Sequence, residues 1–332
     1  MQYTNEELKQ KINELKEKLS VTIVSHFYQR DEVFEVGDIT GDSLELAIKT
    51  RDDDAEFVLF CGVAFMGQSV KVLSPHKRVV MPKLACCAMA KMIDGIYYDD
   101  SVKFLEENGI TKDNILPITY LNLIADVKAK VGEMGGMVCT SSNAKHIITT
   151  ALGEGKKILF VPDRCLGQNI ANQMGLKSMV IGDGGNPKEA DIICYDGFCS
   201  VHQLFTVGDI ESYRKKFPGI LIAVNPECDP SICDASDFVG STSQLIKYIK
   251  ELPEDQKVAV GTEFNMVNRL REKNTYILSS TKPECPTMNE TTLEDVYLTL
   301  KSIEAGEPLN EVLIDDSTQK WAKIALERML AL

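Results

Sequence analysis

Short apolar runs recur along the chain and alternate with segments whose apolar residues have a helical spacing. The runs are continuous rather than alternating, as in strands that are buried on both faces of a parallel sheet. Helical segments such as residues 42–47 and 243–249 separate them, and this strand–helix order is typical of βαβ units with right-handed crossovers. The predicted strands are residues 21–24, 57–60, 78–81, 118–122, 157–160, 191–194, 221–224, 257–260 and 276–278.

One order of features occurs three times, and each copy ends at a cysteine. In each copy a strand leads to polar residues, a serine or threonine opens a helix, and two more strands follow. The third strand of each copy leads in turn to Cys87, Cys199 and Cys285, with Cys86 as a rival of Cys87. The middle copy is longer than the others before its cysteine, and the turn-rich residues 182–187 mark an insertion there.

The repeat predicts an α/β fold of three Rossmann-like α/β/α sandwich domains with parallel sheets. We expect these domains to comprise residues 1–93, 94–204 and 205–289. Amphipathic helices flank the array, at Asn5–Leu19 and within residues 290–332, and we expect both ends to pack against the first domain. Chance similarity among generic βαβ units is the alternative to a true repeat.

Composition and charge narrow the range of functions. The 332 residues carry a formal net charge of −13, which argues against binding to nucleic acid or to an anionic membrane surface. No apolar stretch approaches the roughly 18 residues of a membrane span, and the first residues lack a signal-peptide pattern. We therefore expect a cytoplasmic protein without nucleic-acid or membrane partners.

Ten cysteines are many for a chain without an export signal, so thiols, metal ligands or catalytic groups are expected rather than disulfides. Cys61, Cys139 and Cys194 lie in or beside apolar strands, where burial is the usual role of a cysteine. Three thiolates far apart in sequence suit a [4Fe–4S] cluster, whose fourth iron stays open to substrate and acts as a Lewis acid. Cys199 and His202 could also offer two zinc ligands, but no second pair has zinc spacing.

Polar residues follow the strands in all three copies, at the edge where parallel α/β sheets bind ligands. They are His26, Tyr28, Tyr120, Asn122, Asn225 and Glu227. Hydroxyl groups stand where the next helices begin, at Ser43, Ser141, Ser241 and Thr242. Such hydroxyls either cap the helix or hold an anion such as phosphate or a carboxylate, and the sequence leaves both roles open.

These motifs, taken in order, make the chain similar to the quinolinate synthase family over nearly its whole length. The resemblance rests on residues 26–29, 41–47, 85–90, 120–122, 139–144, 162–163, 197–202, 226–228, 240–243, 260–263 and 285–288. It implies three α/β domains about a pseudo-threefold axis, with a [4Fe–4S] cluster at the centre. It also implies the condensation of iminoaspartate with dihydroxyacetone phosphate to quinolinate, with loss of phosphate and water, and functional coupling to L-aspartate oxidase.

The same resemblance implies a set of ligands and substrate contacts. The cluster ligands are Cys87, Cys199 and Cys285; the family's motif selects Cys87 over Cys86, and it selects Cys285 over Cys228 because only Cys285 is followed by Pro-x-Met. The implied substrate-contacting residues are His26, Tyr28, Ser43, Tyr120, Asn122, Ser141, Glu227 and Thr242. We expect Asn225 and Ser241 to bind substrate as well.

Proton transfer needs candidates of its own, and we assign it to Tyr28 and Glu227, with His26 polarising a carbonyl or hydroxyl oxygen. One departure from the family is plain, because Asn225 stands where its members usually have histidine before Pro-Glu. Asparagine can still bond a carboxylate, but it cannot carry a proton or a positive charge.

Two other functions remain open from the sequence. One is a hydro-lyase that uses the same three-cysteine cluster on a hydroxy acid and needs no phosphate pocket. The other is a binding protein of three Rossmann-like units that holds no metal and catalyses nothing.

Overall fold

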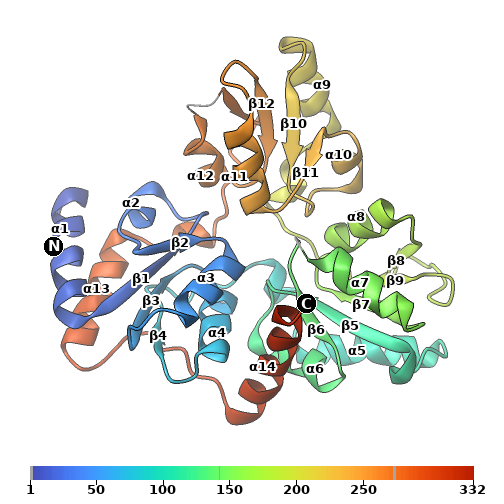
Figure 1. The fold of residues 1–332 in the computed structure, drawn as a ribbon, viewed down its shortest axis with the longest axis horizontal. Helices are drawn as coiled ribbons and strands as arrows, with labels where there is room; N and C mark the ends of the chain where they lie inside the picture. The colour runs from blue at the N-terminus through green and yellow to red at the C-terminus, as the bar shows by residue number, and fades with distance from the viewer. Residues whose placement is uncertain (1–2, 142, 272–273) are drawn as a thin grey trace. The chain divides into compact units, whose positions relative to one another are not determined.

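The computed structural model describes residues 3–141, 143–271 and 274–332; Ser142, within the segment 139–144, lies outside them. The described residues form three sheets of four, five and four strands, with helices packed on the sheets (Figure 1). Every pairing between neighbouring strands is parallel. The predicted α/β class with parallel sheets is therefore confirmed.

One compact unit contains the chain up to Cys87 together with Glu284–Gln319, and it carries the first sheet. The strands have the order β2-β1-β3-β4. They are β1 (Val21–His26), β2 (Ile39–Gly41), β3 (Phe57–Cys61) and β4 (Arg78–Val80). The helices are α1 (Asn5–Leu19), α2 (Asp31–Phe34), α3 (Ser43–Arg51), α4 (Ala64–Leu73), the 3₁₀ turn η5 (Met288–Glu290) and α13 (Leu293–Glu304).

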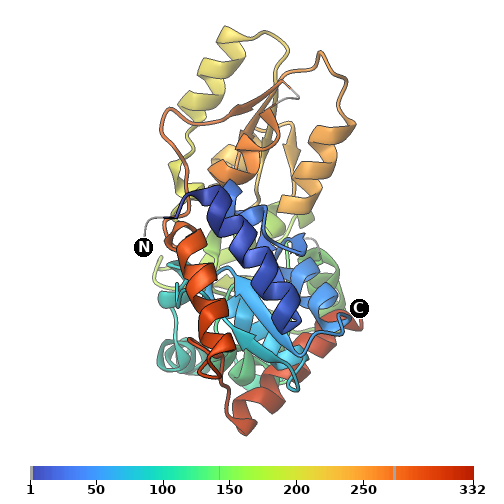
Figure 2. The same cartoon turned by 90° about the vertical axis from the view of Figure 1, so that its left-hand side faces the viewer.

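Helices α1 and α13 come from opposite ends of the chain and lie side by side in this unit (Figure 2). Each begins with a capping box, Thr4 with Glu7 in α1 and Thr292 with Asp295 in α13. The box satisfies N–H groups of the first turn that have no partner within the helix. Apolar side chains of both helices, such as the fully buried Ile12, join the core built on β1 and β3.

The second compact unit contains Ala88–Pro283 and Lys320–Leu332, and it carries the other two sheets. The middle sheet has the order β6-β5-β7-β9-β8 and the last sheet the order β11-β10-β12-β13. The strands are β5 (Ile115–Tyr120), β6 (Met137–Cys139), β7 (Lys157–Val161), β8 (Ser178–Val180), β9 (Ile192–Cys194), β10 (Leu221–Val224), β11 (Phe238–Val239), β12 (Val258–Gly261) and β13 (Thr275–Ile277).

The helices of this unit lie before, between and after its strands in sequence. Around the middle sheet they are η1 (Met89–Lys91), α5 (Gly95–Glu107), η2 (Lys112–Asn114), α6 (Ala125–Glu133), α7 (Ala144–Gly153) and α8 (Arg164–Met174). Around the last sheet they are η3 (His202–Leu204), α9 (Val207–Lys216), α10 (Pro230–Asp234), α11 (Thr242–Glu251) and α12 (Phe264–Asn268). The last helix, α14 (Asp316–Leu330), ends in this unit, where Arg328 donates to the carbonyls of Gly132 and Gly136 at 3.0 and 2.7 Å.

The three sheets repeat one strand order, in which the first strand of each copy has two neighbours: β1 lies between β2 and β3, β5 between β6 and β7, and β10 between β11 and β12. The middle sheet differs only by β8, which pairs with β9 at the edge. The predicted insertion accounts for this strand, since the turn after β8 contains Gly182 and Gly184 at positive φ. The inserted residues therefore extend the sheet at its edge and leave the order of the repeat unchanged.

The helices also bear on the question of membrane insertion. Among the described residues, no helix combines the length and the apolar character needed to cross a bilayer.

Candidate active site

Two strand ends of the second unit bring Tyr120 and Glu227 together. β5 ends at Tyr120, and β10 leads directly into Asn225, Pro226 and Glu227, so both side chains stand at the carboxyl ends of parallel strands. The Tyr120 hydroxyl donates a hydrogen bond to Oε1 of Glu227 at 2.7 Å. Only 8% of Tyr120 and 5% of Glu227 are exposed. Hydrogen bonds to a carboxylate in such a setting are short and strong.

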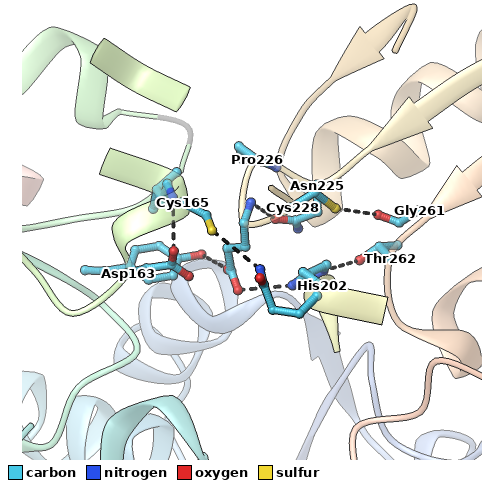
Figure 3. A network of polar contacts seen from close by, with 12 residues as sticks. Asp163, Cys165, His202, Asn225, Pro226, Cys228, Gly261 and Thr262 are labelled. Carbon is cyan, nitrogen blue, oxygen red and sulfur yellow. Dashed lines mark hydrogen bonds and ion pairs between the residues drawn. The ribbon is translucent and has the colours of Figure 1, made fainter. Parts of the chain in front are cut away.

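A buried histidine approaches the other oxygen of the same carboxylate (Figure 3). Nδ1 of His202 lies 3.2 Å from Oε2 of Glu227, although the ring N–H does not point along that line. Nε2 of His202 lies 3.0 Å from the hydroxyl oxygen of Thr262, which follows β12 and is fully buried. Glu227 is thus held between a tyrosine of the middle sheet and a histidine that itself rests on the last sheet.

These contacts decide the charge of Glu227. Burial by itself raises the pKa of the carboxyl group, but His202, Tyr120 and Cys199 all stabilise the anion, and together they hold the pKa below its ordinary value. The Glu227 carboxylate, the Cys199 sulfur and a ring nitrogen of His202 lie within 4.8 Å of one another. The site therefore combines an ionised acid with a thiol and an imidazole.

A second carboxyl group is buried nearby, at Asp163 (Figure 3). Asp163 caps α8, and its Oδ1 accepts the Leu166 N–H at 3.0 Å. Burial and the charge of Glu227 raise the pKa of Asp163 well above its ordinary value. Two neighbouring carboxyl groups whose pKa values are pushed apart are typical of acid–base sites, and here the pKa of Asp163 is raised while that of Glu227 is lowered.

Asn225 fixes the backbone that carries Glu227. Its Oδ1 accepts the Glu227 N–H at 3.0 Å, and the residue is 3% exposed. The first unit repeats this geometry at the end of β1, where Nδ1 of His26 accepts the Tyr28 N–H at 3.0 Å. The His26 and Tyr28 rings meet edge to face, with 4.8 Å between centroids. In each turn the first residue, Asn225 or His26, therefore fixes the backbone that carries the second, Glu227 or Tyr28.

The structure distinguishes the roles of the hydroxyl groups at the helix starts. Ser241 caps α11 by accepting the Gln244 N–H, whereas Asp42 caps α3 and leaves Ser43 as the first helical residue. Thr242 likewise opens α11 as its first residue. Capping accounts for Ser241, so Ser43 and Thr242 are the hydroxyls that stand beside a positive helix end without serving as its cap.

Two further residues that were predicted to contact the substrate lie in loops beside the middle sheet. Asn122 is half-buried just after β5, and Ser141 is half-buried before α7. Asn143, at the start of α7, accepts the Thr140 N–H at 2.8 Å through its side chain.

Burial divides the ten cysteines into two groups. Six are buried: Cys61, Cys139, Cys165, Cys194, Cys228 and Cys233. Burial raises the pKa of each of these six thiols, so they are poor sources of thiolate. The other four are half-buried: Cys86, Cys87, Cys199 and Cys285. The inert role predicted for Cys61, Cys139 and Cys194 agrees with their complete burial.

The half-buried group contains every cysteine predicted to hold the cluster, and it excludes the rival Cys228. A cluster ligand must be a thiolate that the cluster can reach, and the incomplete burial of these thiols is compatible with that requirement. Cys86 and Cys87 are both half-buried, so burial does not distinguish which of them is the cluster ligand. Cys87 and Cys285 belong to the first unit, while Cys199 belongs to the second.

The other predicted site residues are divided in the same way. The first unit carries His26, Tyr28 and Ser43, and the second carries Tyr120, Asn122, Ser141, Asn225, Glu227, Ser241 and Thr242. Sequence reasoning missed three members of the Glu227 environment: His202 as its partner, Thr262 and Asp163. All three lie in segments that carried the family resemblance, and that was the one available signal.

The chain is similar to known proteins over nearly its whole length. Residues 10–331 match the model of the family described as quinolinate synthetase A protein. A quinolinate synthase of Helicobacter pylori (strain HPAG1) is 52% identical over 335 residues, which covers 99% of each chain. A quinolinate synthase of Streptomyces coelicolor is 39% identical over 96% of this chain and 86% of its own length. The chain therefore belongs to the quinolinate synthetase A protein family.

Proposed function

We propose that this protein is a quinolinate synthase, which condenses iminoaspartate with dihydroxyacetone phosphate and releases phosphate and water. The observation that carries the proposal is the buried, ionised Glu227, held by Tyr120 and His202 within 4.8 Å of the Cys199 sulfur. An ionised carboxylate beside a candidate cluster ligand is suited to moving protons on a substrate that the cluster binds. Membership of the quinolinate synthetase A protein family supports the choice of iminoaspartate and dihydroxyacetone phosphate as the proposed substrates.

We assign the cluster to Cys87, Cys199 and Cys285. When bound, a [4Fe–4S] group with one iron not held by cysteine supplies a Lewis acid for a carboxylate, imine or hydroxyl of the substrate. The half-buried state of these three thiols, against the burial of Cys228, supports the assignment.

Glu227 is the group to which we assign proton removal in the later steps. Imine formation, tautomerisation and ring closure with dehydration all need proton transfers, and an ionised Glu227 can accept a proton on a carboxylate oxygen. Tyr120 and His202 orient the two oxygens, so that the carboxylate enters the reaction in one position. The raised pKa of Asp163 and the lowered pKa of Glu227 favour the negative charge on Glu227.

In this proposal His26 and Tyr28 donate protons or hydrogen bonds to oxygen atoms of the substrate. Because Nδ1 of His26 accepts a backbone N–H, the ring carries its proton on Nε2 when neutral and can donate it to a carbonyl or hydroxyl oxygen. Tyr28 offers a phenolic proton from the same turn.

Substrate anions need donors, and the hydroxyls and amides at the strand ends provide them. Ser43 and Thr242 stand at the positive ends of α3 and α11, where phosphate or a carboxylate is favoured. Asn122, Ser141, Asn225 and Ser241 complete the set of proposed substrate-binding residues.

We further propose that the three sheets belong to three domains, which comprise residues 1–93, 94–204 and 205–289. We also propose that an L-aspartate oxidase supplies the unstable iminoaspartate.

Anaerobic reconstitution tests the proposal directly. Iron- and sulfide-loaded protein should form quinolinate from iminoaspartate and dihydroxyacetone phosphate, with one phosphate released per quinolinate. Glu227→Gln should lose this activity at unchanged iron content, while Glu133→Gln, on the exposed end of α6, should not. Fully loaded protein that makes no quinolinate would contradict the proposal, and dehydration of a hydroxy acid without consumption of dihydroxyacetone phosphate would favour a hydro-lyase.

A further inference from the structure

One side-chain amide of α8 holds the backbone on both sides of Glu227. Nδ2 of Asn169 donates to the carbonyl of Pro226 at 2.8 Å and to the carbonyl of Cys228 at 2.8 Å. Asn169 is 1% exposed, so no solvent competes for these bonds. The helix belongs to the middle sheet, whereas the two carbonyls belong to the turn that leaves the last sheet.

The geometry fixes the orientation of this amide. Both neighbours are acceptors, so only the NH₂ end can face them; the opposite orientation would place three oxygens together. The Oδ1 atom is buried and has no hydrogen-bond partner among the described residues. A buried amide oxygen without a partner is unfavourable, and an apolar side chain at this position would avoid that defect. The residue is therefore poorly suited to a role in packing alone.

The two hydrogen bonds of Asn169 connect the middle sheet to the turn that carries Glu227. Tyr120 comes from the middle sheet and Glu227 from the last sheet, yet their oxygens meet at 2.7 Å. Hydrogen bonds within the turn, such as Cys228 N–H to the Asn225 carbonyl at 3.0 Å, shape the turn but do not attach it to the middle sheet. Asn169 makes that attachment at the carbonyl groups of Pro226 and Cys228, the two residues next to Glu227 in sequence.

We propose that Asn169 is a positioning residue, which holds the Glu227 carboxylate in register with Tyr120 and His202. This inference rests on the proposed role of Glu227 in proton transfer. A displacement of about 1 Å at a reacting group can lower a rate by about 100-fold. Loss of the two Asn169 hydrogen bonds should therefore lower kcat rather than weaken substrate binding.

Asn169→Leu tests the proposal, because leucine matches asparagine in shape and removes both bonds. The variant should lower kcat by about 10- to 100-fold, leave KM within about threefold, and keep the wild-type iron content. Asn172→Leu, at an exposed position of the same helix, is the matched control and should leave kcat unchanged. Should Asn169→Leu not fold, Asn169→Ser removes the same bonds with a smaller side chain and carries the same expectation.

A second arm asks whether Asn169 acts through Glu227. In a Glu227→Gln background, Asn169→Leu should cause little further loss of the residual rate, since the group that it positions is already gone. An equal loss in both backgrounds would overturn the proposal, as would a lower unfolding midpoint with an unchanged kcat. If Glu227→Gln alone keeps the wild-type rate, the proposed role of Glu227 fails, and that result is separate from the effect of Asn169.

Discussion

The hydrogen bond from Tyr120 to Glu227 offers the sharpest test of the site. Tyr120→Phe removes only the hydroxyl, which donates to Oε1 at 2.7 Å between two buried side chains. A hydrogen bond to a charged group contributes about 1.5–3 kcal/mol. If the carboxylate needs this bond in the transition state, the loss corresponds to a fall of about 10- to 150-fold in kcat/KM.

The same change should shift the pH dependence in a defined direction. The Tyr120 hydroxyl is one of the groups that hold the pKa of Glu227 below its ordinary value. Without it, the folded-state pKa rises toward that of the unfolded chain, so the acidic limb of the kcat/KM profile should move to higher pH. The stability that ionised Glu227 contributes is present above its unfolded pKa and is lost as the pH falls through the folded pKa, and this contribution should shrink in the variant.

The assay is quinolinate formation under anaerobic conditions across pH 5–9, with iron content measured on each sample. A cycle with Glu227→Gln should show coupling, because the hydroxyl contributes little once the carboxylate is neutral. Tyr98→Phe is the matched control: Tyr98 is also buried in this unit, but its hydroxyl donates only to the Met134 sulfur at 3.1 Å. Additive losses in the cycle, or an unmoved acidic limb in Tyr120→Phe, would refute the reasoning.

Three further changes test other parts of the molecule. Burial lowers the pKa of Lys128 to about 7, so the unfolded chain binds more protons than the folded chain between about pH 7 and 10.5. The free energy of unfolding in urea should therefore rise with pH across that window, and this rise should be absent in Lys128→Met. Cys199→Ala should lose bound iron and the absorbance near 400 nm (about the value typical of iron–sulfur thiolates), whereas Cys228→Ala should keep both. Gly197→Ala would bring a Cβ within 2.5 Å of the Pro162 carbonyl oxygen, so we expect a loss of about 1–3 kcal/mol in unfolding free energy and a lower iron content.

The sheets could be predicted because buried parallel strands leave a strong pattern. The run at residues 257–260 became β12 (Val258–Gly261), and the run at 221–224 became β10 with the same limits. The edge strands β2 and β11 were not predicted, since β2 contains one apolar side chain and β11 two, too few to form a recognisable apolar run. Their place beside the first strand of each copy depends on pairing, which a local pattern does not contain.

The site was predictable only where its residues follow strands. Tyr120 is the last residue of β5 and Glu227 lies three residues after β10, and the rule for parallel sheets identifies positions at such strand ends. His202 lies in a one-turn 3₁₀ helix three residues after Cys199, a spacing that suggests a metal pair rather than a partner for a carboxylate. Its contacts with Glu227 and Thr262 join residues that are 25 and 60 positions away, and only the folded chain brings them together.

The departure at Asn225 is explained by the turn that it occupies. His26 and Asn225 have the same task, because Nδ1 of one and Oδ1 of the other accept the N–H two residues later at 3.0 Å. Both acceptor atoms are the same number of bonds from the backbone, so asparagine replaces histidine without disturbing the turn. What changes is the group that remains for the substrate, a neutral amide NH₂ in place of an imidazole nitrogen. Asparagine therefore preserves the turn that carries Glu227 but offers no titrating group, and in the proposed reaction the proton transfers at this turn are assigned to Glu227.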